Sequence, residues 1–110
     1  MTPEESVQVV YTAFNERDEA TALAGLDTNV QWDDGRGHTL TGKQAVADHW
    51  REQWRTADAR AQIDSIQRNG RELILLVTLE TAQTDGTRNS QSIRNTVRFS
   101  HDLIASMQIG

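Results

Sequence analysis

Four side chains in this sequence are of the types that carry acid–base chemistry: Asp34, Asn95, Tyr11 and His49. A carboxylate in an apolar pocket has a raised pKa and can act as a general base near neutral pH. An amide or a phenol opposite that base can donate a hydrogen bond to a developing enolate oxygen. A base that faces such a donor can abstract a proton beside a carbonyl, so the elements that carry these side chains decide whether they meet.

Asp34 is placed by the alternation of a short strand predicted from Val30 to Asp34. It shares one face of that strand with Val30 and Trp32, whereas Asp33 falls on the opposite face. Asp34, rather than Asp33, is therefore expected to point inward, with a raised pKa beside Trp32. The alternative is that Asp34 only bonds to the backbone of the turn predicted at residues 35–37.

Asn95 lies on the apolar face of a strand predicted at residues 89–100. The other members of that face are Gln91, Ile93, Val97 and Phe99. A buried amide without a partner costs about 1 to 3 kcal/mol, so Asn95 must pair with a neighbour or with a ligand. It either faces a cavity or serves as a structural amide that fixes the register of the strand.

Tyr11 and His49 lie on the apolar stripes of two predicted helices. The first helix starts at a capping box of Thr2 and Glu5 and ends near Asn15. The helix that carries His49 runs from a second capping box at residues 41–44 to about Arg55. Either side chain can face a pocket or pack as an ordinary core residue. The apolar residues expected to line the pocket are Phe14, Trp32, Trp50, Trp54, Val97 and Phe99.

The order of the predicted elements favours an α+β domain spanning residues 1–110. Between the two helices lies a shorter one that Asp18 caps and that carries Ala22, Leu23 and Leu26. The second half is a meander of strands at about residues 58–68, 71–83, 89–100 and 103–109. Turns at Asn69-Gly70, Asp85-Gly86 and residues 100–102 separate the strands. About three helices are therefore expected to cover one face of a mostly antiparallel sheet.

One predicted strand is apolar on both faces. Leu73, Leu75 and Val77 line one side, whereas Ile74 and Leu76 line the other. A face open to solvent is usually polar, so this pattern predicts a homodimer packed through the sheet.

Composition and spacing exclude several classes of partner. The 110 residues carry a formal net charge of −5, which disfavours nucleic acid and anionic membranes. There is no cysteine, no histidine pair with ligand spacing and no glycine-rich phosphate loop, so no metal and no cofactor is expected. His38 and His101 fall in predicted loops and are expected to face solvent. The acidic N-terminal segment precedes no long apolar run, which favours a cytoplasmic location.

The layout resembles the nuclear transport factor 2-like superfamily, particularly its SnoaL-like and ketosteroid isomerase-like branches. The residues that carry the resemblance are Thr2-Pro3-Glu4, Val30-Gln31-Trp32-Asp33-Asp34, Thr41-Gly42-Lys43-Gln44-Ala45-Val46, Val97-Arg98-Phe99 and Ala105-Ser106-Met107. The resemblance implies a cone-shaped, curved sheet with a helix-covered pocket, commonly in a dimer.

By position, the resemblance also implies roles for the four polar residues. Asp34 falls where the isomerases keep their base, and Asn95 falls where they keep an acid that holds the oxyanion. Tyr11 lies one position from their oxyanion tyrosine, and His49 and Trp50 match aromatic pocket positions. Here Asn95 would replace the neutral carboxylic acid that the isomerase uses as a donor.

These observations predict a small-molecule pocket protein that acts as a cofactor-independent acid–base enzyme. The reaction would be proton abstraction of the isomerase, cyclase or dehydratase type on an apolar carbonyl or cyclic substrate. An alternative is a module of the same fold that binds a hydrophobic ligand or dimerises without chemistry. A third possibility is a dehydratase or hydrolase that uses His49 with Asp34, with a pH–rate profile governed by a histidine near about pH 6 to 7.

Overall fold

The computed structural model describes residues 1–110 as three helices and a six-stranded sheet. The helices are α1 (Pro3–Asn15), α2 (Glu19–Ala24) and α3 (Lys43–Ala57). The strands are β1 (Leu26–Asp33), β2 (Thr39–Thr41), β3 (Arg60–Asn69), β4 (Glu72–Ala82), β5 (Arg88–Ser100) and β6 (Leu103–Ile109). The predicted α+β class is confirmed. No helix combines the length and the apolar composition that a bilayer crossing requires.

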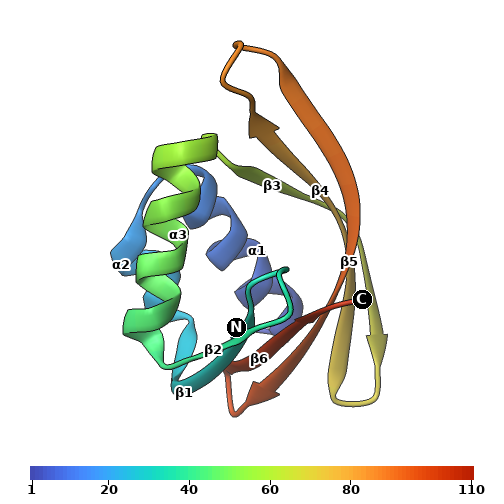
Figure 1. Ribbon diagram of the computed structural model, residues 1–110. Helices are drawn as coiled ribbons and strands as arrows, with labels where there is room; N and C mark the ends of the chain where they lie inside the picture. Colours follow the sequence, from blue (N-terminus) through green and yellow to red (C-terminus); the bar gives the residue numbers. More distant parts are fainter.

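The sheet is mixed, with the strand order β2-β1-β6-β5-β4-β3. Only the β1–β6 pair is parallel, and every other pair is antiparallel. Irregular register in three of the pairs, including the β5–β6 pair at Arg98 and Phe99, bends the strands. Figure 1 shows β4 and β5 curving around one side of the molecule, with all three helices inside the curve.

The start of α1 matches the predicted capping box. The Thr2 hydroxyl accepts a hydrogen bond from the Glu5 N–H at 3.1 Å, and the Glu5 carboxylate accepts one from the Thr2 N–H at 3.0 Å. Asp18 caps α2 as predicted, because its carboxylate accepts a hydrogen bond from the Thr21 N–H. The local sequence therefore determines where these two helices begin.

The predicted capping box before α3 is wrong. The N-cap is Gly42, with φ 90°, and no side chain bonds to the first turn. Thr41 cannot cap because it is the last residue of β2, where it pairs with Gln31. Gly42 turns the chain sharply out of that strand, and its N–H donates to the Val30 carbonyl at 2.8 Å.

Leu26 was also predicted to belong to the short helix, but it begins β1. Its side chain is fully buried, and its backbone pairs with Ile104 of β6. Pairing with a strand that is distant in the sequence thus overrides the local helical pattern.

The core fills the space between the helices and the concave face of the sheet. Alternation is confirmed in β4, where Leu73, Leu75 and Val77 are buried and Leu76 is 51% exposed on the outer face. It is confirmed in β5 as well, where Asn95 is 3% exposed. The concave face therefore brings a polar side chain into an otherwise apolar interior.

Candidate active site

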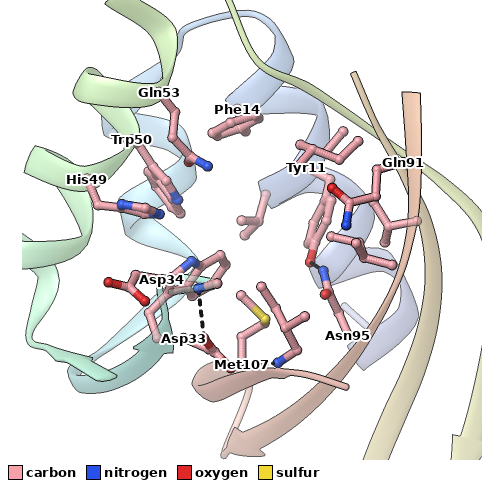
Figure 2. Close-up of a pocket in the computed structure, with 18 of the residues that line it drawn as sticks. Tyr11, Phe14, Asp33, Asp34, His49, Trp50, Gln53, Gln91, Asn95 and Met107 are labelled. Carbon is pink, nitrogen blue, oxygen red and sulfur yellow. Dashed lines mark hydrogen bonds between the residues drawn. The ribbon is translucent and has the colours of Figure 1, made fainter. Parts of the chain in front are cut away.

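A cavity of about 380 Å³ opens between the helices and the concave face of the sheet. Its lining includes all four candidate polar residues, Tyr11, Asp34, His49 and Asn95. Figure 2 shows Asp34 and His49 on one side of the cavity, with Tyr11 and Asn95 on the opposite side. The first pair comes from the end of β1 and from α3, and the second pair from α1 and β5.

Tyr11 and Asn95 form a buried hydrogen-bonded pair. The Asn95 Nδ2 donates to the Tyr11 hydroxyl oxygen at 2.7 Å, and Tyr11 is 7% exposed. Burial raises the pKa of Tyr11 to about 12, and the bond from Asn95 opposes that rise. The phenol is therefore protonated at neutral pH. Because Asn95 occupies an acceptor position on its oxygen, the phenolic proton is free for another acceptor.

The other half of the Asn95 amide is unsatisfied. Its Oδ1 is buried and has no hydrogen-bond partner. A buried acceptor without a donor costs about 1 to 3 kcal/mol. The Asn95 amide therefore holds the Tyr11 hydroxyl through its Nδ2, while its buried Oδ1 lowers the stability of the fold.

Asp34 lines the cavity and also bonds to the turn that follows it. Its Oδ1 accepts hydrogen bonds from the N–H groups of Arg36 at 2.7 Å and His38 at 3.1 Å. The expected rise in its pKa is wrong, because these N–H groups, the Arg36 bond first, hold the pKa of Asp34 below its usual value despite partial burial. Asp34 therefore lines the cavity and also bonds to the turn, and it is ionised at neutral pH.

Asp33 was predicted to point away from the interior, yet it also lines the cavity. Its carboxylate accepts hydrogen bonds from the N–H groups of Gly35 at 2.8 Å and Ile109 at 3.1 Å. Asp33 is the last residue of β1, still paired with Thr39 of β2, and Asp34 already lies outside the strand, so the alternation of β1 does not separate these two side chains.

His49 is half-buried on the cavity side of α3. Desolvation lowers the pKa of His49 below its usual value, the negative charge of Asp34 opposes this shift, and the positive charge of Arg36 adds to it. The imidazole is therefore neutral at neutral pH. By contrast, His38 is 78% exposed and His101 is exposed, as predicted for loop residues.

Aromatic rings form the apolar part of the wall. Trp50 packs edge-to-face on Trp32, with ring centroids 5.4 Å apart, and on Phe14 at 5.9 Å. All three rings line the cavity. Such edge-to-face packing holds the rings in fixed orientations.

Three residues predicted for the pocket do not line it: Trp54, Val97 and Phe99. Trp54 packs against Phe14, with ring centroids 5.4 Å apart, and the Arg17 guanidinium lies over the Trp54 ring. Val97 is completely buried in the core below the cavity, and Phe99 follows the irregular register that bends β5. Alternation identifies the face of a strand but not the depth at which a cavity ends.

Sequence reasoning missed other lining residues. They include Arg36, Gln53, Met107 and Ile109. Gln91 and Ile93 also line the cavity, and they share the face of Asn95, so alternation alone could have selected them. No group of three or more His, Asp or Glu side chains is arranged to hold a metal ion.

The curved sheet, the three helices and the cavity between them define the nuclear transport factor 2-like class of folds. An NTF2-like protein of unknown function from Burkholderia pseudomallei is similar at a TM-score of 0.86 and 23% identity, covering 100% of this chain and 91% of that chain. The sequence profile of the SnoaL-like domain matches residues 7–107, and the chain belongs to that family. No curated protein sequence matches the chain significantly.

Two further structures of this class contain small organic molecules. One is a hypothetical protein with a ketosteroid isomerase-like fold from Catenulispora acidiphila in complex with trimethylamine, at 15% identity and a TM-score of 0.86, covering 96% of this chain and 84% of that chain. The other is a Mycobacterium tuberculosis protein in complex with estradiol-17β-hemisuccinate, at 16% identity and a TM-score of 0.85, covering 99% of this chain and 93% of that chain. Proteins of this fold thus bind small molecules of different sizes.

Proposed function

We propose that this protein binds a small, mostly apolar organic molecule in the cavity and transfers a proton on it without a cofactor. The reaction is of the isomerase, cyclase or dehydratase type. One observation carries the proposal: a neutral imidazole with a carboxylate near it faces a protonated phenol across an apolar cavity. The small ligands in the two relatives support the binding part of the proposal.

His49 is the proton acceptor in this proposal. A carboxylate with a lowered pKa is a weak base, so Asp34 fits a supporting role better than the predicted role of base. The pKa of a histidine imidazolium is much closer to neutral pH than the pKa of a carboxylic acid, so the neutral imidazole is the stronger base. When His49 takes up a proton, the negative charge of Asp34 stabilises the imidazolium that forms.

Tyr11 stabilises the other end of the transition state. His49 removes a proton from the carbon beside a substrate carbonyl, and the C–H electron pair moves to form an enolate. The negative charge that develops on the oxygen accepts a hydrogen bond from the Tyr11 hydroxyl. The imidazolium then returns the proton to a different carbon. Asn95 holds the Tyr11 hydroxyl and is a positioning residue.

Deuterium uptake tests the chemistry directly. A panel of cyclic ketones incubated with the protein in D₂O should include members that exchange the proton on the carbon beside the carbonyl faster than in buffer. NMR spectroscopy detects the exchange. If no member of the panel that binds exchanges faster than in buffer, the catalytic part of the proposal is wrong.

The pH dependence of this exchange should report His49. Because the base must be neutral, the rate should fall as the pH falls through the lowered pKa of His49, below about 6.5. His49→Gln should remove this acidic limb and lower the rate by about 10² to 10⁴. The measurement is the exchange rate from acidic to neutral pH.

Asp34→Asn separates the two possible bases. Asparagine keeps an Oδ1 that can accept the turn N–H groups, but it removes the charge that raises the pKa of His49. The acidic limb should therefore move to lower pH, and the rate at neutral pH should fall only in part, because His49 is still present as the base but its imidazolium has lost the charge that stabilises it. An Asp34→Asn variant that has lost nearly all activity at every pH would return the base role to Asp34.

One observation favours binding without chemistry as a second candidate function. The Asp34 carboxylate is engaged by the turn backbone, so the turn needs Asp34 whether or not a reaction occurs. A protein of this kind would bind cyclic ketones but leave their exchange rate unchanged. Binding and exchange measured on the same panel distinguish the two functions.

We also propose that two copies of the chain associate through the outer face of the sheet. Leu76 is 51% exposed on this face, and Ile74 lies beside it on the same strand. Leu76→Lys should convert a dimer to a monomer in light scattering after size-exclusion chromatography, because it places a charge in an apolar contact. The matched control is Val9→Lys, which also places a charge on an exposed apolar side chain, but on α1 and not on the sheet. A wild-type protein that is monomeric at high concentration would contradict this proposal.

A further inference from the structure

We propose that the ligand of this cavity carries an ammonium group with apolar substituents. The inference rests on the proposed function, because it names the substrate class of the same cavity. It follows from two features of the lining: two carboxylates that no arginine or lysine pairs with, and the aromatic rings of the same cavity.

The carboxylates supply the charge. Asp33 and Asp34 both line the cavity, and neither forms an ion pair with an arginine or a lysine. Backbone N–H groups hold both carboxylates in place, two on each side chain. The exposed His38 side chain approaches Asp34 from outside the cavity lining, with its Nδ1 3.4 Å from the Asp34 Oδ2. Within the lining no cationic side chain pairs with either carboxylate, so a ligand cation can serve as their counter-ion.

The other titratable groups of the cavity leave its charge negative. Arg36 is the one cationic side chain in the lining, so two carboxylates and one guanidinium give a net charge of −1. Arg36 is exposed on the turn, at the edge of the cavity. His49 is neutral because burial lowers its pKa, and Tyr11 is neutral because burial raises its pKa. An anionic ligand would meet both carboxylates.

The aromatic rings supply the second half of the site. Phe14, Trp32 and Trp50 line the same cavity as the carboxylates. The faces of aromatic rings attract cations, most strongly where water is excluded, and they also pack against the alkyl groups of a substituted ammonium. A neutral hydrocarbon gains only the packing. The combination of carboxylates and aromatic rings in one lining therefore favours a hydrophobic cation over a neutral molecule of the same shape.

The test compares two probes of the same shape. Benzyltrimethylammonium and neopentylbenzene differ in that a quaternary nitrogen replaces a quaternary carbon. Quenching of tryptophan fluorescence follows their binding, because Trp32 and Trp50 line the cavity. The wild-type protein should bind the ammonium probe about tenfold more tightly than the hydrocarbon. Added salt should weaken binding of the ammonium probe only.

Two variants of equal net charge locate the source of the preference. Asp34→Asn should reduce the preference, measured as the ratio of the two affinities in the same variant, to about two- to threefold. Asp102→Asn removes one negative charge at an exposed turn outside the cavity and should leave the preference intact. Circular dichroism establishes that both variants are folded.

Each outcome bears on a different claim. Equal affinity for the two probes would overturn the ammonium proposal and leave the proposed function standing, because the cavity would still bind a small apolar molecule. A preference that survives Asp34→Asn, or tighter binding of benzylsulfonate than of benzyltrimethylammonium, would also overturn it. Failure of every probe, including the cyclic ketones, would overturn the proposed function together with this inference.

Discussion

Tyr11→Phe should lower the exchange rate by about 10² to 10³ at neutral pH, which is the usual effect of removing one donor to an oxyanion. The substitution removes the hydroxyl and keeps the ring that fills the space between α1 and β5. The phenol is the donor because its proton is free while Asn95 donates to its oxygen. Its pKa, raised to about 12, keeps that proton in place at every pH at which the base works.

Asn95→Leu is the matched control for Tyr11. It keeps the phenol but removes its positioning partner, so the rate should fall by a smaller factor than in Tyr11→Phe. It removes the unsatisfied Oδ1 and also the hydrogen bond to the buried Tyr11 hydroxyl, and because these two effects oppose each other the free energy of unfolding should change by less than about 1 kcal/mol. A loss of rate with little change in stability is typical of a polar group kept for function.

A variant that carries both Tyr11→Phe and Asn95→Leu completes a double-mutant cycle. If Asn95 acts only through Tyr11, Asn95→Leu should have little further effect on the rate once Tyr11 is phenylalanine. The measurement is the deuterium exchange rate of all four proteins on the ketone with the fastest wild-type rate. Fully additive effects would show that the two side chains act independently, and a wild-type rate in Tyr11→Phe would exclude the phenol as the donor.

Trp50→Ala should reduce the free energy of unfolding by about 3 to 5 kcal/mol. The ring is 2% exposed and lies among Phe14, Trp32 and Trp54, so its removal leaves a void that those rings cannot close. The whole domain is stable by only about 5 to 15 kcal/mol, so this one change removes a large part of the total. Urea denaturation followed by circular dichroism measures the loss.

Two other variants keep this prediction testable. Trp50→Leu retains part of the apolar volume, so it should unfold at a urea concentration between those of Trp50→Ala and the wild type. Trp54→Leu is the control for ligand binding, because Trp54 packs on Phe14 but does not line the cavity. It should leave the affinity for apolar probes within about threefold of the wild type, whereas Trp50→Leu should weaken it by about tenfold. Equal losses of affinity in the two variants would mean that the cavity wall is wrongly assigned.

Alternation and capping predicted most of the elements that carry the site. Asn95 faces inward because its strand is regular up to that residue, and the helix of Tyr11 begins where Thr2 and Glu5 can bond to each other. The prediction failed where a distant partner decided the local structure. Leu26 joins a strand because β6 lies beside it, and Thr41 belongs to β2 instead of capping α3.

The pKa of Asp34 is a further property that the sequence alone could not predict. The sequence places an acid beside Trp32 and before a glycine, which is compatible with a raised or a lowered pKa. The direction depends on whether burial or hydrogen bonding to the carboxylate is the stronger effect. The turn at residues 35–38 directs two N–H groups at one oxygen, and this arrangement exists only after the turn is formed.

The linear order of residues by itself determined the α+β class, the inward face of Asn95 and the apolar stripes that carry Tyr11 and His49, because these depend on spacings within one element. Only the tertiary structure decided that Asp33 lines the cavity and that Trp54, Val97 and Phe99 lie outside it. It also decided that the pKa of Asp34 is lowered and not raised. The physical reason is that cavity depth, desolvation and hydrogen bonding to a charge depend on atoms from several elements at once. Those contacts form when the curved sheet closes around the helices.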